Sequence, residues 1–99
     1  MRRLWRRIMR LIGRDPGPRW IRGRYMLGFE VSMFQPDGST ERWWTTFDEK
    51  LGKSAEQLQA AARGDAIESE LAGEVSDLGS YGHLGSYDRA FLVHAIRHR

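Results

Sequence analysis

The chain contains no cysteine among its 99 residues. This absence excludes a disulfide framework, a thiolate metal site and a cysteine nucleophile, and nothing in the composition points to an oxidising compartment. The sequence also lacks any apolar run close to the roughly 20 residues that a membrane-spanning helix needs. Its N-terminus is interrupted by arginine and has no signal-peptide core. We therefore expect a cytoplasmic protein without a membrane span.

Lysine is absent before residue 50, and the positive charge is segregated. Residues 1–24 hold nine arginines against Asp15 alone, a net charge of +8; since the whole chain carries +3, residues 25–99 carry −5. The guanidinium group can bind two phosphate oxygens at once, so an arginine-only segment suits contact with phosphate. A basic segment is equally compatible with a membrane surface.

The length predicts a single domain over residues 1–99, with one core and no elaborate cleft. The three histidines lack metal-ligand spacing. Asp48 and Glu49 are adjacent and would face apart, which leaves no acid–base pair of carboxylates, and no serine lies in a nucleophile elbow. We expect no enzyme, no cofactor and no metal.

A β-hairpin is predicted from Arg24 to Phe47. Apolar residues alternate over 24–34, which is typical of a half-buried strand. Residues 35–39 contain Pro36, which fixes φ, and Gly38, which tolerates a positive φ, so they predict a turn. The returning strand, 40–47, is rich in aromatic and β-branched residues. We expect Phe29, Val31 and Phe47 in the core.

The second half of the chain predicts a helix and two strands. Strong helix formers over 54–62 indicate a short helix, with Ser54 as its cap, Gly64 as its stop, and Leu58, Ala61 and Ala62 as its apolar stripe. Residues 66–75 fit either a helix or a strand, and their glycines favour a strand with a bulge at Gly73. A glycine-rich loop over 76–87 precedes a final strand over 89–96.

Residues 4–12 leave two alternatives open. Their apolar positions fit a basic amphipathic helix, yet a strand here would complete the order of an OB-fold. The predicted fold class is therefore mainly β, a five-stranded OB-fold barrel with one short helix between strands 3 and 4.

Motifs along the chain resemble those of the bacterial single-stranded DNA-binding protein family. They are Ile12-Gly13-Arg14-Asp15-Pro16 with Arg19-Trp20, Gly28-Phe29-Glu30-Val31-Ser32, Trp43-Trp44-Thr45-Thr46-Phe47, Arg63-Gly64-Asp65, Gly73-Glu74-Val75, and Tyr87 to Ile96. The resemblance is to a short version without the family's acidic tail. It implies that residues 4–12 are a strand, and that the protein is a non-catalytic, sequence-independent single-stranded DNA-binding homodimer or homotetramer. The processes it implies are DNA replication, repair and recombination, with replication or mobile-element proteins as partners.

Such a protein binds exposed bases on aromatic platforms and phosphates on cations. The expected stacking residues are Trp43, Phe34, Tyr81, Trp44 and Tyr87. Trp43 and Trp44 face opposite ways on a strand, and the family pattern favours Trp43 as the surface platform. The expected phosphate ligands are Arg19, Arg22, Arg24, Lys50, Lys53 and Arg89.

Cross-strand ion pairs are the alternative for three other arginines, because the first and fourth strands of such a barrel pair. Arg6, Arg7 and Arg10 would then lie opposite Glu68, Glu70 and Glu74.

Two other functions fit the sequence. One is an OB-fold protein–protein interaction module of a replication, conjugation or phage complex that binds nucleic acid weakly. The other keeps residues 1–12 as a basic amphipathic helix that binds a membrane or RNA.

Overall fold

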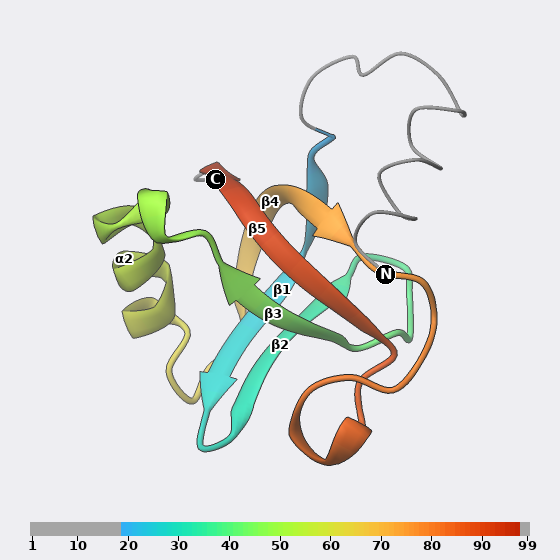
Figure 1. Ribbon diagram of the computed structural model, residues 1–99. Coiled ribbons are helices and arrows are strands. Elements are labelled where there is room, and N and C mark those ends of the chain that lie inside the picture. Colours follow the sequence, from blue (N-terminus) through green and yellow to red (C-terminus); the bar gives the residue numbers. More distant parts are fainter. Residues whose placement is uncertain (1–18, 98–99) are drawn as a thin grey trace.

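A computed structural model describes residues 19–97 as a closed barrel of five strands (Figure 1). The strands are β1 (Ile21–Gly28), β2 (Val31–Pro36), β3 (Trp43–Phe47), β4 (Ile67–Val75) and β5 (Arg89–Arg97). Their order around the barrel is β1-β2-β3-β5-β4, and every pair is antiparallel except β3 with β5. The helix α2 (Lys53–Ala61) lies between β3 and β4, with short 3-10 turns at Glu49–Leu51 and His83–Gly85. The predicted fold class, a mainly β OB-like barrel, is confirmed.

The first strand of the barrel differs from the prediction. Residues 24–34, expected as one strand, belong to β1 and β2, which are joined by a tight turn at Phe29 and Glu30. The apolar alternation runs through this turn without a break, and neither central residue is glycine or asparagine although Gly28 precedes them, so the pattern does not reveal it. Residues 4–12, the expected first strand or helix, lie outside the described residues. The predicted turn after Pro36 is confirmed, with Gly38 at φ 75°.

The predictions for the two C-terminal strands are confirmed, including the bulge. The register shifts between Ala72 and Gly73, so that His94 of β5 is skipped in the pairing. A Cβ at Gly73 would lie 1.9 Å from the Leu92 carbonyl oxygen, so the close approach of β5 requires glycine.

The helix is also confirmed, but its expected cap is wrong. Gly52, not Ser54, occupies the N-cap position of α2. Ala55 and Leu58 are buried, with Ala62 just beyond the helix, whereas Ala61 is exposed. The Leu27 amide donates to the Ala62 carbonyl at 3.0 Å, which fixes the helix end against β1.

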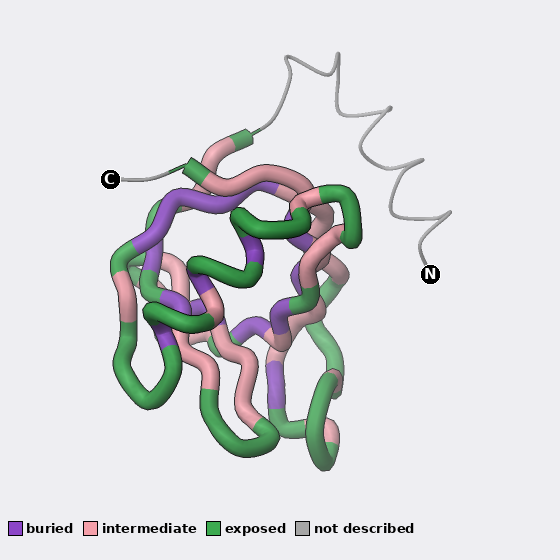
Figure 2. Tube along the Cα trace, turned by 90° about the vertical axis from the view of Figure 1, so that its left-hand side faces the viewer, coloured by how far each residue is buried: buried purple, intermediate pink, exposed green. Residues whose placement is uncertain are grey.

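The core fills the barrel interior with aromatic and branched side chains. Tyr25, Phe34, Leu71, Phe91 and Val93 are fully buried. Figure 2 shows buried stretches alternating with exposed ones along the chain, and the exposed residues include the β1–β2 turn and most of α2. The three residues expected in the core differ in burial. Phe47 is partly buried and packs against the core, and Val31 is only half-buried. Phe29 is 90% exposed, so its expected place in the core is wrong. Phe29 is exposed because it forms the β1–β2 turn.

Candidate nucleic-acid interface

The two adjacent tryptophans lie on opposite faces of β3, in the reverse of the expected order. Trp43 is buried at 8% exposure, and its ring stands 5.2 Å from that of Phe91. Its indole Nε1 donates to Glu41 Oε1 at 2.9 Å. Trp44 therefore faces outward and is half-buried. The expectation that Trp43 is the surface platform is wrong.

Two more of the expected stacking residues are inaccessible to a base. Phe34 is fully buried against Trp43 and Phe91, and Tyr87 is 5% exposed. Tyr81 is half-buried, and its amide donates to the Tyr87 carbonyl at 3.0 Å within the β4–β5 loop. Of the five candidates, only Trp44 and Tyr81 keep accessible surface beyond a few per cent.

A row of partly exposed apolar side chains crosses the outer face of β1, β2 and β3. Met26 is the register partner of Met33, and Met33 is that of Trp44. The buried neighbours Tyr25, Phe34 and Trp43 alternate with them, so this row points away from the core. In an OB-fold, this side of the barrel and the loops beside it are where ligands bind.

The β4–β5 loop, residues 76–88, lies over one side of Trp44. A Cβ at Gly82 would come within 2.5 Å of the Trp44 ring, so the loop backbone is in direct contact with the indole. Tyr87 stands edge-on to Trp44, with centroids 5.1 Å apart. These contacts orient the indole, and Met33 is its register partner on β2.

The guanidinium groups of two exposed arginines on this face make no ion pair within residues 19–97. Arg24 extends from the outer face of β1, two residues before Met26. The Arg42 guanidinium lies 5.0 Å from the Tyr87 ring centre and donates to the Ser86 carbonyl at 3.0 Å. Both side chains are exposed. We call Trp44, Met33, Met26, Arg24 and Arg42 the outer-face site.

Three of the other expected phosphate ligands are paired with acids. The shortest contacts are 3.6 Å between Arg22 and Glu70, 3.8 Å between Lys50 and Asp48, and 2.8 Å between Arg89 and Glu41. Arg19 and Lys53 are exposed, but neither belongs to the outer-face site.

The strongest of these pairs supports the structure around Trp43. Hydrogen bonds from Arg89 and Trp43 hold the pKa of Glu41 below its usual value, and the Glu41 carboxylate raises the pKa of Arg89. Arg89 is therefore a structural residue, not a free cation.

The expected placement of arginines across from glutamates on neighbouring strands is found, but with other arginines. Arg22 is the register partner of Glu70 and Arg24 that of Glu68. Arg6, Arg7 and Arg10 lie outside the described residues. The antiparallel pairing of the first strand with β4 was anticipated correctly, whereas the identity of that first strand was not.

A histidine bridges three elements on another part of the surface. His94 contacts Asp48 through Nδ1 at 3.0 Å and Glu74 through Nε2 at 2.6 Å. The two carboxylates contact different ring nitrogens, so His94, Asp48 and Glu74 do not converge on one position where a metal ion could bind. Within residues 19–97 no group of three or more potential ligands could hold a metal ion.

Sequence reasoning did not identify Arg42 as a candidate ligand. Its only local signal is its position next to the tryptophan pair, and its place beside Tyr87 depends on the fold of the β4–β5 loop.

Comparison with protein-family models, curated proteins and solved structures finds no match to this chain. Within the described part of the chain, no helix has the length and apolar character to cross a membrane. The resemblance to single-stranded DNA-binding proteins therefore stays a prediction. One of its motifs, Gly28 to Ser32, spans the β1–β2 turn and so does not form a single strand.

Proposed function

We propose that the protein binds single-stranded nucleic acid at the outer-face site. The resemblance to single-stranded DNA-binding proteins favours DNA as this nucleic acid. The observation that carries this proposal is the position of Trp44 on the outer face of the barrel, with Arg42 beside it and the exposed Arg24 two strands away on the same face. A base would stack on the indole, and the two guanidinium groups would contact the neighbouring phosphates. Binding is non-catalytic. It is also independent of base sequence, because every base has a face that can stack on an aromatic ring. By composition, we place it in the cytoplasm.

The charge of the barrel limits the strength of this binding. Residues 19–97 hold nine Lys and Arg residues against twelve Asp and Glu residues, a net charge of −3. Affinity at the barrel then depends on a few placed cations and not on a general positive field. Two phosphate contacts correspond to a log–log salt slope of about −1.4 for a single strand.

The test is a titration of the full chain with fluorescently labelled oligo-dT, followed by anisotropy at several salt concentrations. Trp44→Ala should weaken binding about 5- to 150-fold, the loss expected for one stacked base. Arg24→Ala and Arg42→Ala should each flatten the salt slope by about 0.7. Lys53→Ala is the matched control, since Lys53 is an exposed cation on α2. No binding by the unaltered chain at low salt would refute the proposal.

A protein partner is the second candidate, and the apolar row favours it. Met and Trp are enriched at protein interfaces, and Met adapts to different partners. In a replication or mobile-element complex, Met26 and Met33 would supply the contact area. Met33→Ser should then abolish partner binding, and the unaltered chain should bind oligo-dT only weakly.

A further inference from the structure

One side of β1 carries a line of cationic and aromatic side chains that continues past the outer-face site. Arg22 and Arg24 are exposed on this side and alternate with buried residues such as Tyr25. The same alternation places Met26 at one end of the line and Trp20 at the other. At about 3.3 Å per residue, the two ends lie roughly 20 Å apart. The line therefore leads from the outer-face site to the start of β1.

At this end of the barrel two arginines share one carboxylate. Glu70 of β4 is the register partner of Arg22 on one side and of Arg97 on the other. Its Oε2 lies 3.6 Å from Arg22 Nε and 3.7 Å from Arg97 Nη1. Charge-assisted hydrogen bonds are about 2.7–2.9 Å long, and a guanidinium has several N–H donors, so both cations keep donors for another anion. Together with the exposed Arg19, three arginines and one glutamate give a net charge of +2 here.

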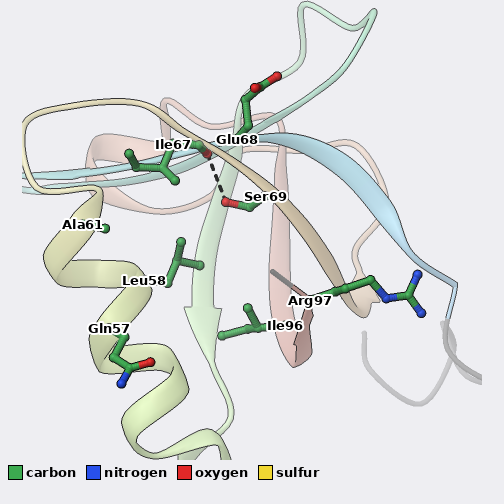
Figure 3. A pocket seen from close by; sticks show the side chains of 8 residues that line it. All are labelled: Gln57, Leu58, Ala61, Ile67, Glu68, Ser69, Ile96 and Arg97. Atoms are coloured by element: carbon green, nitrogen blue, oxygen red, sulfur yellow. Dashed lines mark hydrogen bonds between the residues drawn. The ribbon is translucent and has the colours of Figure 1, made fainter. Parts of the chain in front are cut away.

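The cations of this group are exposed, whereas the carboxylate is covered. The side chains of Arg22 and Arg97 are 60% and 52% exposed, and that of Glu70 is 11% exposed. The Arg97 guanidinium lies 4.2 Å from the centre of the Trp20 ring, a cation–π contact that holds it in place. Figure 3 shows the Arg97 side chain pointing away from the apolar groove between α2 and the sheet, and well away from Glu68. We call this group the β1-end site, which consists of Arg19, Trp20, Arg22 and Arg97.

More positive charge is attached to the chain at this place. The described residues end at Arg19 and Arg97, and these two ends meet at the contact between Trp20 and Arg97. Residues 1–18 hold six arginines against Asp15, and Arg99 follows two positions after Arg97. The β1-end site therefore joins the strongly basic part of the chain to a barrel of net negative charge.

We infer that the β1-end site binds the phosphate backbone of a nucleic-acid strand, as a continuation of the outer-face site along β1. The inference rests on the proposed function for the identity of the ligand. Arg22 and Arg97 bind phosphate oxygens on either side of Glu70. Trp20 holds the Arg97 guanidinium in position, and Arg19 supplies a third cation. Contacts of this kind add affinity and orient the strand without reading its bases.

Binding of two lengths of labelled oligo-dT to the full chain tests the inference. About four nucleotides span about 14 Å at about 3.4 Å each and fit the outer-face site alone, whereas about twelve reach the β1-end site as well. Arg97→Gln should weaken binding of the longer oligo-dT about 10-fold, the effect of losing one hydrogen bond to a charged group, and should flatten its salt slope by about 0.7. Arg22→Gln should do the same. In each variant Glu70 keeps one arginine partner, so the fold is retained.

The shorter oligo-dT is the internal control, because it should bind both variants as it binds the unaltered chain. Arg63→Gln is the matched control variant. Arg63 is also an exposed arginine, but it lies beside Leu27, at the opposite end of β1. It should change neither the affinity nor the salt slope of the longer oligo-dT.

The pattern across the variants separates this inference from the proposed function. If Trp44→Ala weakens binding of the longer oligo-dT while both arginine variants bind it like the unaltered chain, the inference is overturned and the proposed function stands. Loss in the arginine variants with none in Trp44→Ala would refute the outer-face site and support the β1-end site. An unaltered chain that binds no oligo-dT would refute both.

Two further results would overturn the inference. An equal loss of the shorter and the longer oligo-dT in Arg22→Gln and Arg97→Gln would show that the two arginines support the fold and not a second contact. The other result concerns vesicles that contain phosphatidylserine, which also attract clustered arginines. Loss of vesicle binding in both variants, with oligo-dT binding unchanged, would assign the β1-end site to an anionic membrane surface.

Discussion

The ring of Trp43 stands edge-on to that of Phe91, with centroids 5.2 Å apart and planes at 82°. This contact joins β3 to β5, the parallel pair that closes the barrel. Edge-to-face aromatic pairs add to the free energy of burial. Trp43 is thus a structural residue, and the next residue in the chain carries the proposed function.

Replacing each tryptophan separates these two tasks. Trp43→Ala should lower the free energy of unfolding by about 3–5 kcal/mol, the range for deleting a buried aromatic side chain. Trp44→Ala should cost clearly less, because Trp44 is only half-buried. Urea unfolding followed by circular dichroism measures both. Equal losses for the two variants would contradict the assignment of faces.

Alternation along 43–47 shows that the tryptophans face opposite ways, but it cannot tell which face is the core. That choice depends on which side of β3 meets Phe91, a contact between residues 48 positions apart. The β1–β2 turn was missed for a different reason. Phe29 and Glu30 have no turn-forming signature, and Glu30 adopts a positive φ that its residue type rarely takes.

Local sequence signals were sufficient to predict an element where a residue type has a single physical explanation at its position. Gly73 within a β-branched and alternating stretch indicated a bulge, and helix formers before Gly64 indicated α2. The basic site was harder to predict. Arg22 meets Glu70 because the two are register partners, and Arg89 meets Glu41, just before β3, because Arg89 is the register partner of Trp43. Composition alone does not show that Arg22 and Arg89 are paired with carboxylates.

The bulge glycine should be the least replaceable of the strand glycines. Gly73→Ala would place a Cβ 1.9 Å from the Leu92 carbonyl oxygen, so β5 must move away from β4. We expect a loss of more than about 2 kcal/mol in unfolding free energy, as for an overpacked core site. Gly28→Ala is the control, since its Cβ would meet Val31 at an ordinary 3.7 Å. Thermal unfolding of the two variants should differ clearly, and a similar midpoint would argue against the strand register.

Acid should weaken the contact that Glu41 makes with Arg89 and Trp43. The pKa of Glu41 is lowered in the folded state, so its contribution is present above the unfolded value of about 4.3 and is lost as the pH falls through the folded value. Glu41→Gln removes the charge and should cost about 1 kcal/mol at pH 7. The cost should shrink toward zero as the pH falls through the folded pKa of Glu41. Urea midpoints measured from pH 7 downward follow this change, and a cost that does not change with pH would exclude this ionic contribution.

Gly82 allows the β4–β5 loop to rest on the Trp44 ring, and its replacement tests whether that loop controls access to the indole. Gly82→Ala would bring a Cβ within 2.5 Å of the ring, which forces the loop outward. Gly85→Ala is a matched control, because both glycines have a positive φ, 68° and 64°, yet a Cβ at Gly85 would meet only Ser80, at 3.4 Å. Both variants place an alanine at a positive φ, but Gly82 has a ψ of −154°, a region that is almost exclusive to glycine, so Gly82→Ala also carries backbone strain of its own. Only Gly82→Ala should increase quenching of tryptophan fluorescence by acrylamide and change the affinity for oligo-dT. If the loop shields the indole from bases, the affinity rises; if the loop holds the indole in its binding orientation, the affinity falls. Equal quenching in the two variants would mean that the loop does not determine the exposure of Trp44.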